Sequence, residues 1–160
     1  MLIQSAKSLG FFSFAQNSLP LLLESVPDAP HPPSLIVTGA TASLRGGATF
    51  GTFAAGKFAL RALSQSLARE FGPKGVHVAH VIVDGVIDIP RTKGYNVNSG
   101  VADGKISADA VSLARPVFAA TGHDILTIPL QIADNYWYLH SQHRSAFTYE
   151  LDLRPYVEKF

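Results

Sequence analysis

The sequence predicts an α/β fold built around a parallel β-sheet. Helical segments and β-branched runs alternate along the 160 residues in the order helix, strand, helix, strand, irregular segment, helix, strand. Strands that alternate with helices favour crossover connections, and these produce a parallel sheet. The length, with 47% hydrophobic and 16% charged residues, suits a single globular domain with a sizeable core.

The first half of the chain contains two helical segments and the first strand. Residues 5–25 are apolar over a helical length and are interrupted only by Pro20. Four prolines within residues 27–33 exclude a helix there. The β-branched run 34–38 suits a strand that is covered on both faces. The strongest helical pattern follows at 52–71, and its apolar surface is wider than one stripe, which predicts packing on two sides.

The second half is less regular. Residues 72–75 (GPKG) end the long helix, and a second β-branched strand follows at 76–83. Residues 86–125 mix Gly, Pro, Asn and Asp with one possible helix at 107–115, and so long an irregular stretch is usually functional or mobile. A helix at 129–140 and a final strand at 146–153 complete the pattern.

The composition argues against several classes of function. The formal net charge is +1, so we expect no nucleic-acid partner. The chain has no cysteine, its six histidines are scattered, and His123, His140 and His143 lack a ligand spacing, so we expect no metal site. No apolar run reaches the roughly eighteen residues of a membrane span, so we expect no span.

The N-terminal segment allows two interpretations. Lys7 is the only charged residue before Glu24, and residues 9–15 are mostly apolar, a pattern that also occurs in signal and transit peptides. The apolar pattern continues through residues 19–23, which favours a buried helix over a leader. We therefore expect a cytoplasmic protein.

Three sequence blocks occur in a characteristic order. They are residues 35–43 (LIVTGATAS), residues 53–60 (FAAGKFAL) and residues 83–85 (VDG). In this order they resemble the short-chain dehydrogenase/reductase (SDR) family. There the blocks carry the catalytic serine, the Tyr-x-x-x-Lys helix and a Pro-Gly turn.

The resemblance implies a partial Rossmann-like, doubly wound parallel sheet. Residues 1–160 would form a single truncated domain equivalent to the C-terminal half of an SDR. Within this domain we expect three regions, namely an active-site and dimer region at 5–71, a substrate-loop region at 86–125, and the last helix and strand within 129–155.

The pair Thr38-Gly39 also allows a competing alignment with the cofactor fingerprint Thr-Gly-x-x-x-Gly-x-Gly. That fingerprint needs glycines because the backbone must approach a pyrophosphate at a helix N-terminus. Here Ser43 and Arg45 stand at the required glycine positions. We therefore assign Thr38-Gly39 to the active-site strand.

The resemblance implies a catalytic tetrad of Asn, Ser, Tyr and Lys. In the family Tyr is the acid or base, Lys lowers the Tyr pKa and binds the nicotinamide ribose, Ser holds the substrate oxygen, and Asn orders a water. Lys57 retains the Lys, but Phe53 stands at the Tyr position, and a phenyl ring has no ionisable proton. Thr41, with Ser43 as a near neighbour, takes the Ser position, and Lys7 takes the Asn position.

The cofactor contacts that the resemblance implies are altered as well. Asp84 stands at the Pro of the Pro-Gly turn, before Gly85, and Ile89 replaces the Thr that would bind the nicotinamide amide. With Lys57, these are vestigial cofactor-binding positions. NAD(P) is therefore implied by family resemblance alone, and we expect poor binding to this chain, because the half that holds adenosine and pyrophosphate is absent from the alignment.

Structural roles compete with these catalytic ones. Lys57 could be a surface or interface lysine. A phenylalanine such as Phe53 more often packs in a core or an interface than contacts a ligand. Thr41 and Ser43 could cap the loop, and Asp84 could satisfy the backbone of the turn. Three charged residues near the C-terminus are expected to form local or intersubunit ion pairs rather than to act in catalysis; they are Glu150, Asp152 and Arg154.

Three functions follow from these observations. The first is a truncated SDR-like protein that is impaired in cofactor binding and catalysis. The second is an active NAD(P)-dependent oxidoreductase on a carbonyl or alcohol, with Tyr95 as a candidate proton donor. The third is a non-enzymatic module that forms a homodimer through the apolar helices at 5–25 and 52–71. In each case the strand at 34–38 would lie at an exposed sheet edge.

Overall fold

The computed structural model describes residues 2–107 and 132–159. The helices are α1 (Leu2–Ser25), α2 (Gly51–Phe71) and α4 (Ile132–His140), and the strands are β1 (Ser34–Thr38), β2 (His77–Val83), β3 (Ile87–Asp88), β4 (Ile106–Ser107) and β5 (Glu150–Leu153). Short 3₁₀ helices lie between them at Thr41–Ser43, Gly72–Lys74, Pro90–Thr92 and Asn98–Gly100. The predicted alternation of helices and strands is confirmed.

The main sheet has three parallel strands in the order β1-β2-β5. β3 and β4 pair in a separate short parallel ladder. The predicted α/β fold with a parallel sheet is therefore confirmed. Within the described ranges β1 pairs with β2 alone and lies at one edge of the sheet, which is the position expected for the strand at 34–38.

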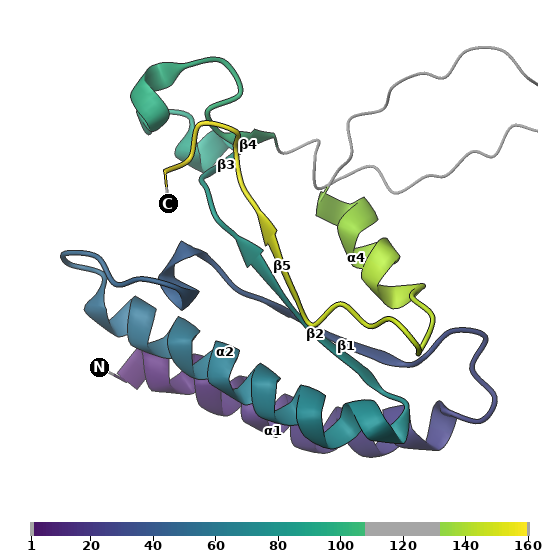
Figure 1. Cartoon of the computed structure of the whole chain (residues 1–160). Coiled ribbons are helices and arrows are strands. Elements are labelled where there is room, and N and C mark those ends of the chain that lie inside the picture. The colour runs from purple at the N-terminus through teal and green to yellow at the C-terminus, as the bar shows by residue number, and fades with distance from the viewer. Residues whose placement is uncertain (1, 108–131, 160) are drawn as a thin grey trace, which may run out of the picture.

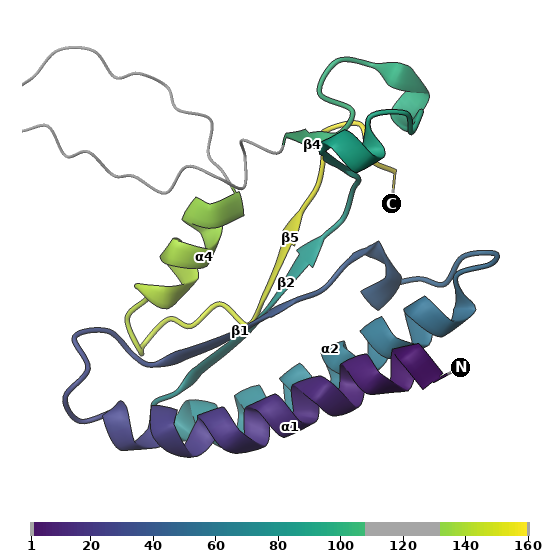
Figure 2. The same cartoon turned by 180° about the vertical axis from the view of Figure 1, so that it is seen from behind.

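Helices cover both faces of the main sheet (Figures 1 and 2). α1 and α2 lie side by side along one face, and α4 lies on the other. The first face buries one apolar core, whose fully buried members are Ala15, Leu19, Leu35, Leu67, Val76 and Val78. The second face buries another, centred on Ala79, Val81 and Leu139. Because alternate residues of β2 face the two cores, this strand is buried almost throughout.

Packing within this chain covers only part of the broad apolar surface of α2. The helix contacts both α1 and the sheet, and it buries Ala54, Leu60 and Leu67 there. Apolar residues on its other side, including Phe58 and Ala59, stay exposed. None of the helices in the described ranges is sufficiently long and apolar to cross a membrane.

The last strand is shorter than the sequence pattern predicts. Residues 146–149 are not in the sheet, and β5 begins only at Glu150. The side-chain amide of Gln142 donates to Thr148 Oγ1 at 2.7 Å, while its oxygen accepts from the Thr148 N–H at 2.7 Å. The Thr148 carbonyl faces His77 Nε2 at 2.9 Å. These local bonds engage the backbone N–H and C=O of Thr148, which in a longer strand would be hydrogen-bonded to the neighbouring strand.

The region from 86 to 107 is irregular, as predicted, apart from β3, β4 and two 3₁₀ turns. The possible helix at 107–115 lies outside the described residues except for Ser107, which belongs to β4. The predicted helix at 129–140 appears as α4 from Ile132, and residues 129–131 also lie outside the described ranges.

Candidate functional site

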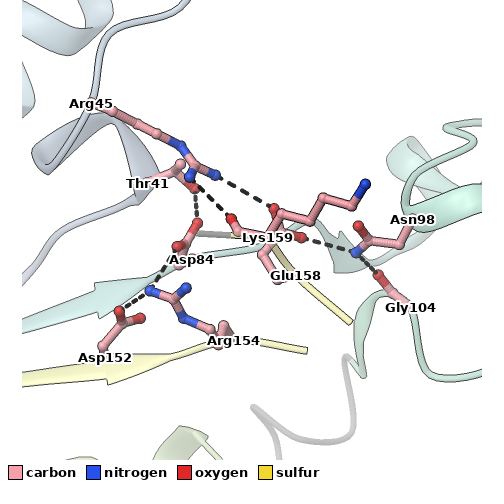
Figure 3. Close-up of polar contacts among 9 residues, drawn as sticks. All are labelled: Thr41, Arg45, Asp84, Asn98, Gly104, Asp152, Arg154, Glu158 and Lys159. Carbon is pink, nitrogen blue, oxygen red and sulfur yellow. Dashed lines mark hydrogen bonds and ion pairs between the residues drawn. The ribbon is translucent and has the colours of Figure 1, made fainter. Parts of the chain in front are cut away.

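Three polar residues meet where the strands of the main sheet end. Thr41 lies in the 3₁₀ turn after β1, Asp84 directly follows β2, and Arg154 directly follows β5. Because the three strands are parallel, their carboxyl ends lie at one edge, where ligands of open α/β sheets usually bind. Figure 3 shows the three side chains joined by hydrogen bonds and ion pairs at this edge.

The Thr41 hydroxyl donates to Oδ1 of Asp84. Asp84 is only 1% exposed, and its other oxygen forms an ion pair with Arg154 Nη2 at 3.1 Å. Arg154 also pairs with Asp152, and that bond raises the pKa of its guanidinium. A hydroxyl has one proton and two lone pairs, so Thr41 bound in this way can accept, but not donate, a further hydrogen bond.

Thr41 faces a cleft of about 660 Å³. This volume lies within the range of roughly 300–1,000 Å³ that is usual for small-molecule sites. The lining is mostly small and apolar and comes from four regions of the chain: Ala40, Thr41, Ala42, Arg45, Gly46, Gly47, Phe50, Phe53, Val83, Gly85, Val86, Val97, Asn98 and Glu158. The cleft therefore contains Thr41 and Phe53, which the SDR resemblance places at two of the four tetrad positions.

Phe53 and Lys57 lie one turn apart on α2. The Lys57 ammonium lies 5.9 Å from the centre of the Phe53 ring and donates to the Thr38 carbonyl at 2.9 Å. Lys57 thus stands near the ring that replaces the tyrosine of the motif. Nothing in the Phe53 ring can exchange a proton with a substrate.

Ser43 does not lie in the cleft. It is completely buried, and its hydroxyl accepts a hydrogen bond from the Ala40 N–H at 3.1 Å. A Cβ added to Gly39 would lie 2.7 Å from His80 Cε1 and 2.9 Å from Ser43 Oγ, so only glycine fits between these side chains. The structure therefore gives Ser43 the capping role that the sequence left open, while Thr41 faces the cleft.

The remaining predicted positions are dispersed. Gly85 lines the cleft, but Ile89 does not; its side chain is 38% exposed, and its N–H donates to Thr92 Oγ1 at 3.0 Å. Tyr95 lies on a different hollow, formed by residues 88–107. Lys7 belongs to α1, and its side chain is outside the described part of the structure. Asp84 binds the side chains of Thr41 and Arg154.

Sequence reasoning did not find a second polar cluster, which joins α2 to β2 and β5. Arg61 donates to both carboxylate oxygens of Glu150, at 2.8 and 2.7 Å, and His80 Nδ1 lies 2.9 Å from the same carboxylate. The Arg61 hydrogen bonds lower the pKa of Glu150, while burial lowers the pKa of His80. Glu150 and Arg154 both form ion pairs within the chain, which is one of the two kinds of pair expected.

The family model described as Enoyl-(Acyl carrier protein) reductase matches residues 2–115. The comparison with curated proteins gave no match. Among solved structures, a short-chain dehydrogenase from Rhodopseudomonas palustris is 34% identical, with a TM-score of 0.54 over 89% of this chain and 45% of that chain.

Two further structures share the fold at lower identity. A putative short-chain dehydrogenase/reductase from Burkholderia xenovorans is 22% identical, with a TM-score of 0.59 over 92% of this chain and 50% of that chain. A short chain dehydrogenase from Burkholderia cenocepacia J2315 in complex with NADP is 21% identical, with a TM-score of 0.51 over 79% of this chain and 46% of that chain. The chain spans about half the length of these solved proteins. With its α/β architecture and the family match over most of its length, the chain belongs to the short-chain dehydrogenase/reductase family.

Proposed function

We propose that this chain is an SDR-like protein, equivalent to the C-terminal half of the family's domain, whose cofactor binding and catalysis are impaired. The observation that carries the proposal is Phe53, which lines the cleft beside Lys57 at the position of the proton-transferring tyrosine. An SDR reaction needs a proton donor or acceptor at the substrate oxygen. The phenyl ring supplies neither, so the tyrosine-dependent step is missing.

The residues of this chain do not complete a nicotinamide site. Ile89 offers no polar side-chain atom at the position expected to hold the carboxamide, and it lies outside the cleft. The Lys57 ammonium already donates to Thr38 O. One solved relative is described as complexed with NAD and another with NADP, but this chain spans only 47% and 46% of those proteins. We therefore propose no strong binding of either cofactor to this chain.

Calorimetric titration of the 160-residue chain with NAD(H) and NADP(H) tests the cofactor part. We expect no saturable binding in the micromolar range; saturable micromolar binding would contradict the proposal. Turnover is then measured on a panel of carbonyl and alcohol substrates, at high concentrations of both cofactors, for the natural chain, for Phe53→Tyr and for Phe58→Tyr. Phe58 is a matched control, because it is an exposed phenylalanine on the same helix.

We expect the natural chain and the Phe58→Tyr variant to be inactive. Activity in Phe53→Tyr alone would show that the missing proton transfer is the limiting defect. Turnover by the natural chain that disappears in Lys57→Ala would favour the alternative function, an active NAD(P)-dependent oxidoreductase. That alternative is supported by the size of the cleft and by the Thr41 hydroxyl that faces it.

Homodimer formation through α1 and α2 is a second proposed function. The two helices border an apolar groove of about 390 Å³, and four large apolar residues of α1 are 45–65% exposed; they are Leu9, Phe12, Phe14 and Leu21. Exposed apolar side chains beside an apolar groove often mark an interaction site. Light scattering after size exclusion should give twice the 17.1 kDa mass of one chain, and a stable monomer would contradict this proposal. We propose the cytoplasm as the location, with cell fractionation as the test.

A further inference from the structure

A carboxylate of the chain itself lines the cleft. Glu158, from the segment after β5, approaches the Arg45 guanidinium with 3.8 Å between Oε1 and Nη2. The Asn98 side-chain amide donates to the other oxygen, Oε2, at 2.9 Å. Figure 3 shows Arg45 and Asn98 on opposite sides of Glu158, with Arg45 also bonded to the Lys159 carbonyl at 3.0 Å.

The positive and the negative charge of the cleft lining belong to the two residues of this contact. Among the described residues that line the cleft, Arg45 is the only cation and Glu158 is the only anion. If Glu158 moved away, the lining would keep one guanidinium and many apolar atoms. An incoming carboxylate would restore the balance and could form charge-assisted bonds with the guanidinium, which suits this geometry.

Asn98 is fixed before any ligand arrives. Its backbone is left-handed, with φ of 50°, a conformation that asparagine tolerates better than most residues. Its amide nitrogen donates to the Gly104 carbonyl at 2.8 Å as well as to Glu158. Because the Gly104 bond holds the amide in place, its second N–H stays directed at the position of the carboxylate.

We propose that Arg45 and Asn98 form a carboxylate-binding subsite, in which Glu158 is an internal stand-in for the carboxylate of a small organic acid. An external carboxylate would displace Glu158 and the segment after β5 that carries it. This inference concerns binding alone and does not depend on whether the chain transfers hydride.

Thr41 indicates which polar group such a ligand would carry at the end away from its carboxylate. It lines the same cleft, and with its proton donated to Asp84 it can only accept a further hydrogen bond. A ligand hydroxyl can donate to Thr41 Oγ1, whereas a ketone oxygen cannot. The subsite and Thr41 together therefore fit a hydroxy acid better than the corresponding keto acid.

The test uses ¹⁵N-labelled chain titrated with 5-hydroxypentanoate and, separately, with uncharged 1,5-pentanediol. The signals followed are the Asn98 side-chain amide, Arg45 Nε, and the backbone amides of Glu158 and Lys159. We expect saturable millimolar shifts at all four with 5-hydroxypentanoate and none with the diol. Equal responses to the two compounds, or shifts that leave Glu158 and Lys159 unchanged, would overturn the proposal.

Variants separate the subsite from general charge effects. Glu158→Gln removes the competing carboxylate, so 5-hydroxypentanoate should bind about three- to tenfold more tightly. Arg45→Gln should weaken its binding at least about tenfold. Glu24→Gln and Arg91→Gln remove the same charges from exposed positions outside the cleft and should leave binding unchanged. Unchanged affinity in both cleft variants would contradict the proposal, and the natural-chain titration remains decisive if either variant fails to fold.

Discussion

The hydroxyl of Thr41 is hydrogen-bonded to the buried carboxylate of Asp84, which joins the turns that follow two adjacent parallel strands. Arg154 extends this contact to the third strand through its ion pair with Asp84. The carboxylate therefore links the ends of the three strands, at a position where the SDR resemblance predicts a proline. Its loss should affect the stability of the whole sheet edge.

Replacing Asp84 by Asn is expected to lower the free energy of unfolding by about 3 kcal/mol. The substitution leaves the Arg154 cation beside a neutral amide in a buried position, and breaking one partner of a buried pair is strongly destabilising. Asp152→Asn is the matched control, because its side chain is 32% exposed and it pairs with the same arginine. That control should lose less than about 1 kcal/mol. Urea unfolding measures both, and equal losses would contradict the prediction.

Thr41→Val should destabilise the chain by about 1–3 kcal/mol, because it leaves Oδ1 of Asp84 without its donor in a buried site. Thr41→Ser keeps the hydroxyl and should lose much less. The two variants are compared by thermal unfolding at one pH. If serine were as damaging as valine, packing of the threonine methyl group would be the important property, rather than the hydrogen bond.

Gly39→Ala is expected to lower the free energy of unfolding by about 2–3 kcal/mol, since the new methyl group would press on His80 and Ser43. Both of these side chains are buried and have little room to move. Gly46→Ala serves as the control, because a Cβ there meets no atom within 4 Å. It should change stability by no more than about 0.5 kcal/mol. A tolerated alanine at position 39 would show that the His80 ring can shift.

Stability should fall in two steps as the pH is lowered. Burial holds the pKa of His80 below its ordinary value of 6.5, so the unfolded chain takes up a proton first as the pH falls through 6.5. The Arg61 hydrogen bonds hold the pKa of Glu150 below its ordinary value of 4.5, so a second loss follows below that pH. Both groups bind fewer protons in the folded state, and therefore both steps have the same sign.

The unfolding free energy measured between pH 8 and pH 3.5 tests these two steps. His80→Gln should flatten the profile between about pH 7 and pH 5 by up to roughly 1.4 kcal/mol per pH unit. Glu150→Gln should flatten it below about pH 4.5. An unaltered slope near neutral pH in the His80 variant would assign that step to another group.

Phe12→Glu should convert the proposed dimer to a monomer in light scattering. Phe12 lines the apolar groove between α1 and α2 and is 45% exposed, so a charge there would have to be buried in a dimer. Tyr156→Glu alters a 78% exposed aromatic residue outside the groove and should leave the mass unchanged. If both variants keep the mass of a dimer, the interface lies elsewhere.

The elements with clear periodicity could be predicted from the sequence. The strand at 34–38 agrees with β1, and the helix at 52–71 differs from α2 by one residue, because local apolar spacing and flanking glycines and prolines determine both. The last strand was predicted too long, because bonds from Gln142 and His77 to Thr148 remove its first residues from the sheet. Side chains that compete with sheet hydrogen bonds in this way leave no periodic pattern in the sequence.

The site was only partly predictable. Thr41 and Phe53 follow from the SDR motifs and do line one cleft. The partners in the ion pairs could not be predicted, because Arg61 and Glu150 are 89 positions apart and any of several acidic residues could have been the partner. The same holds for Arg45 and Glu158, whose meeting depends on where the segment after β5 turns.

The position of β5 in the sequence determines when β2 gains its second neighbour during synthesis. This strand lies at residues 150–153, yet it pairs with β2, which ends at Val83. A nascent chain that has reached residue 100 could form α1, β1, α2 and β2, but β2 would expose its free edge and Asp84 would still lack its arginine. Transiently unpaired strands of this kind invite aggregation, so production of this protein should depend on chaperones that shield β2 until residue 154 emerges.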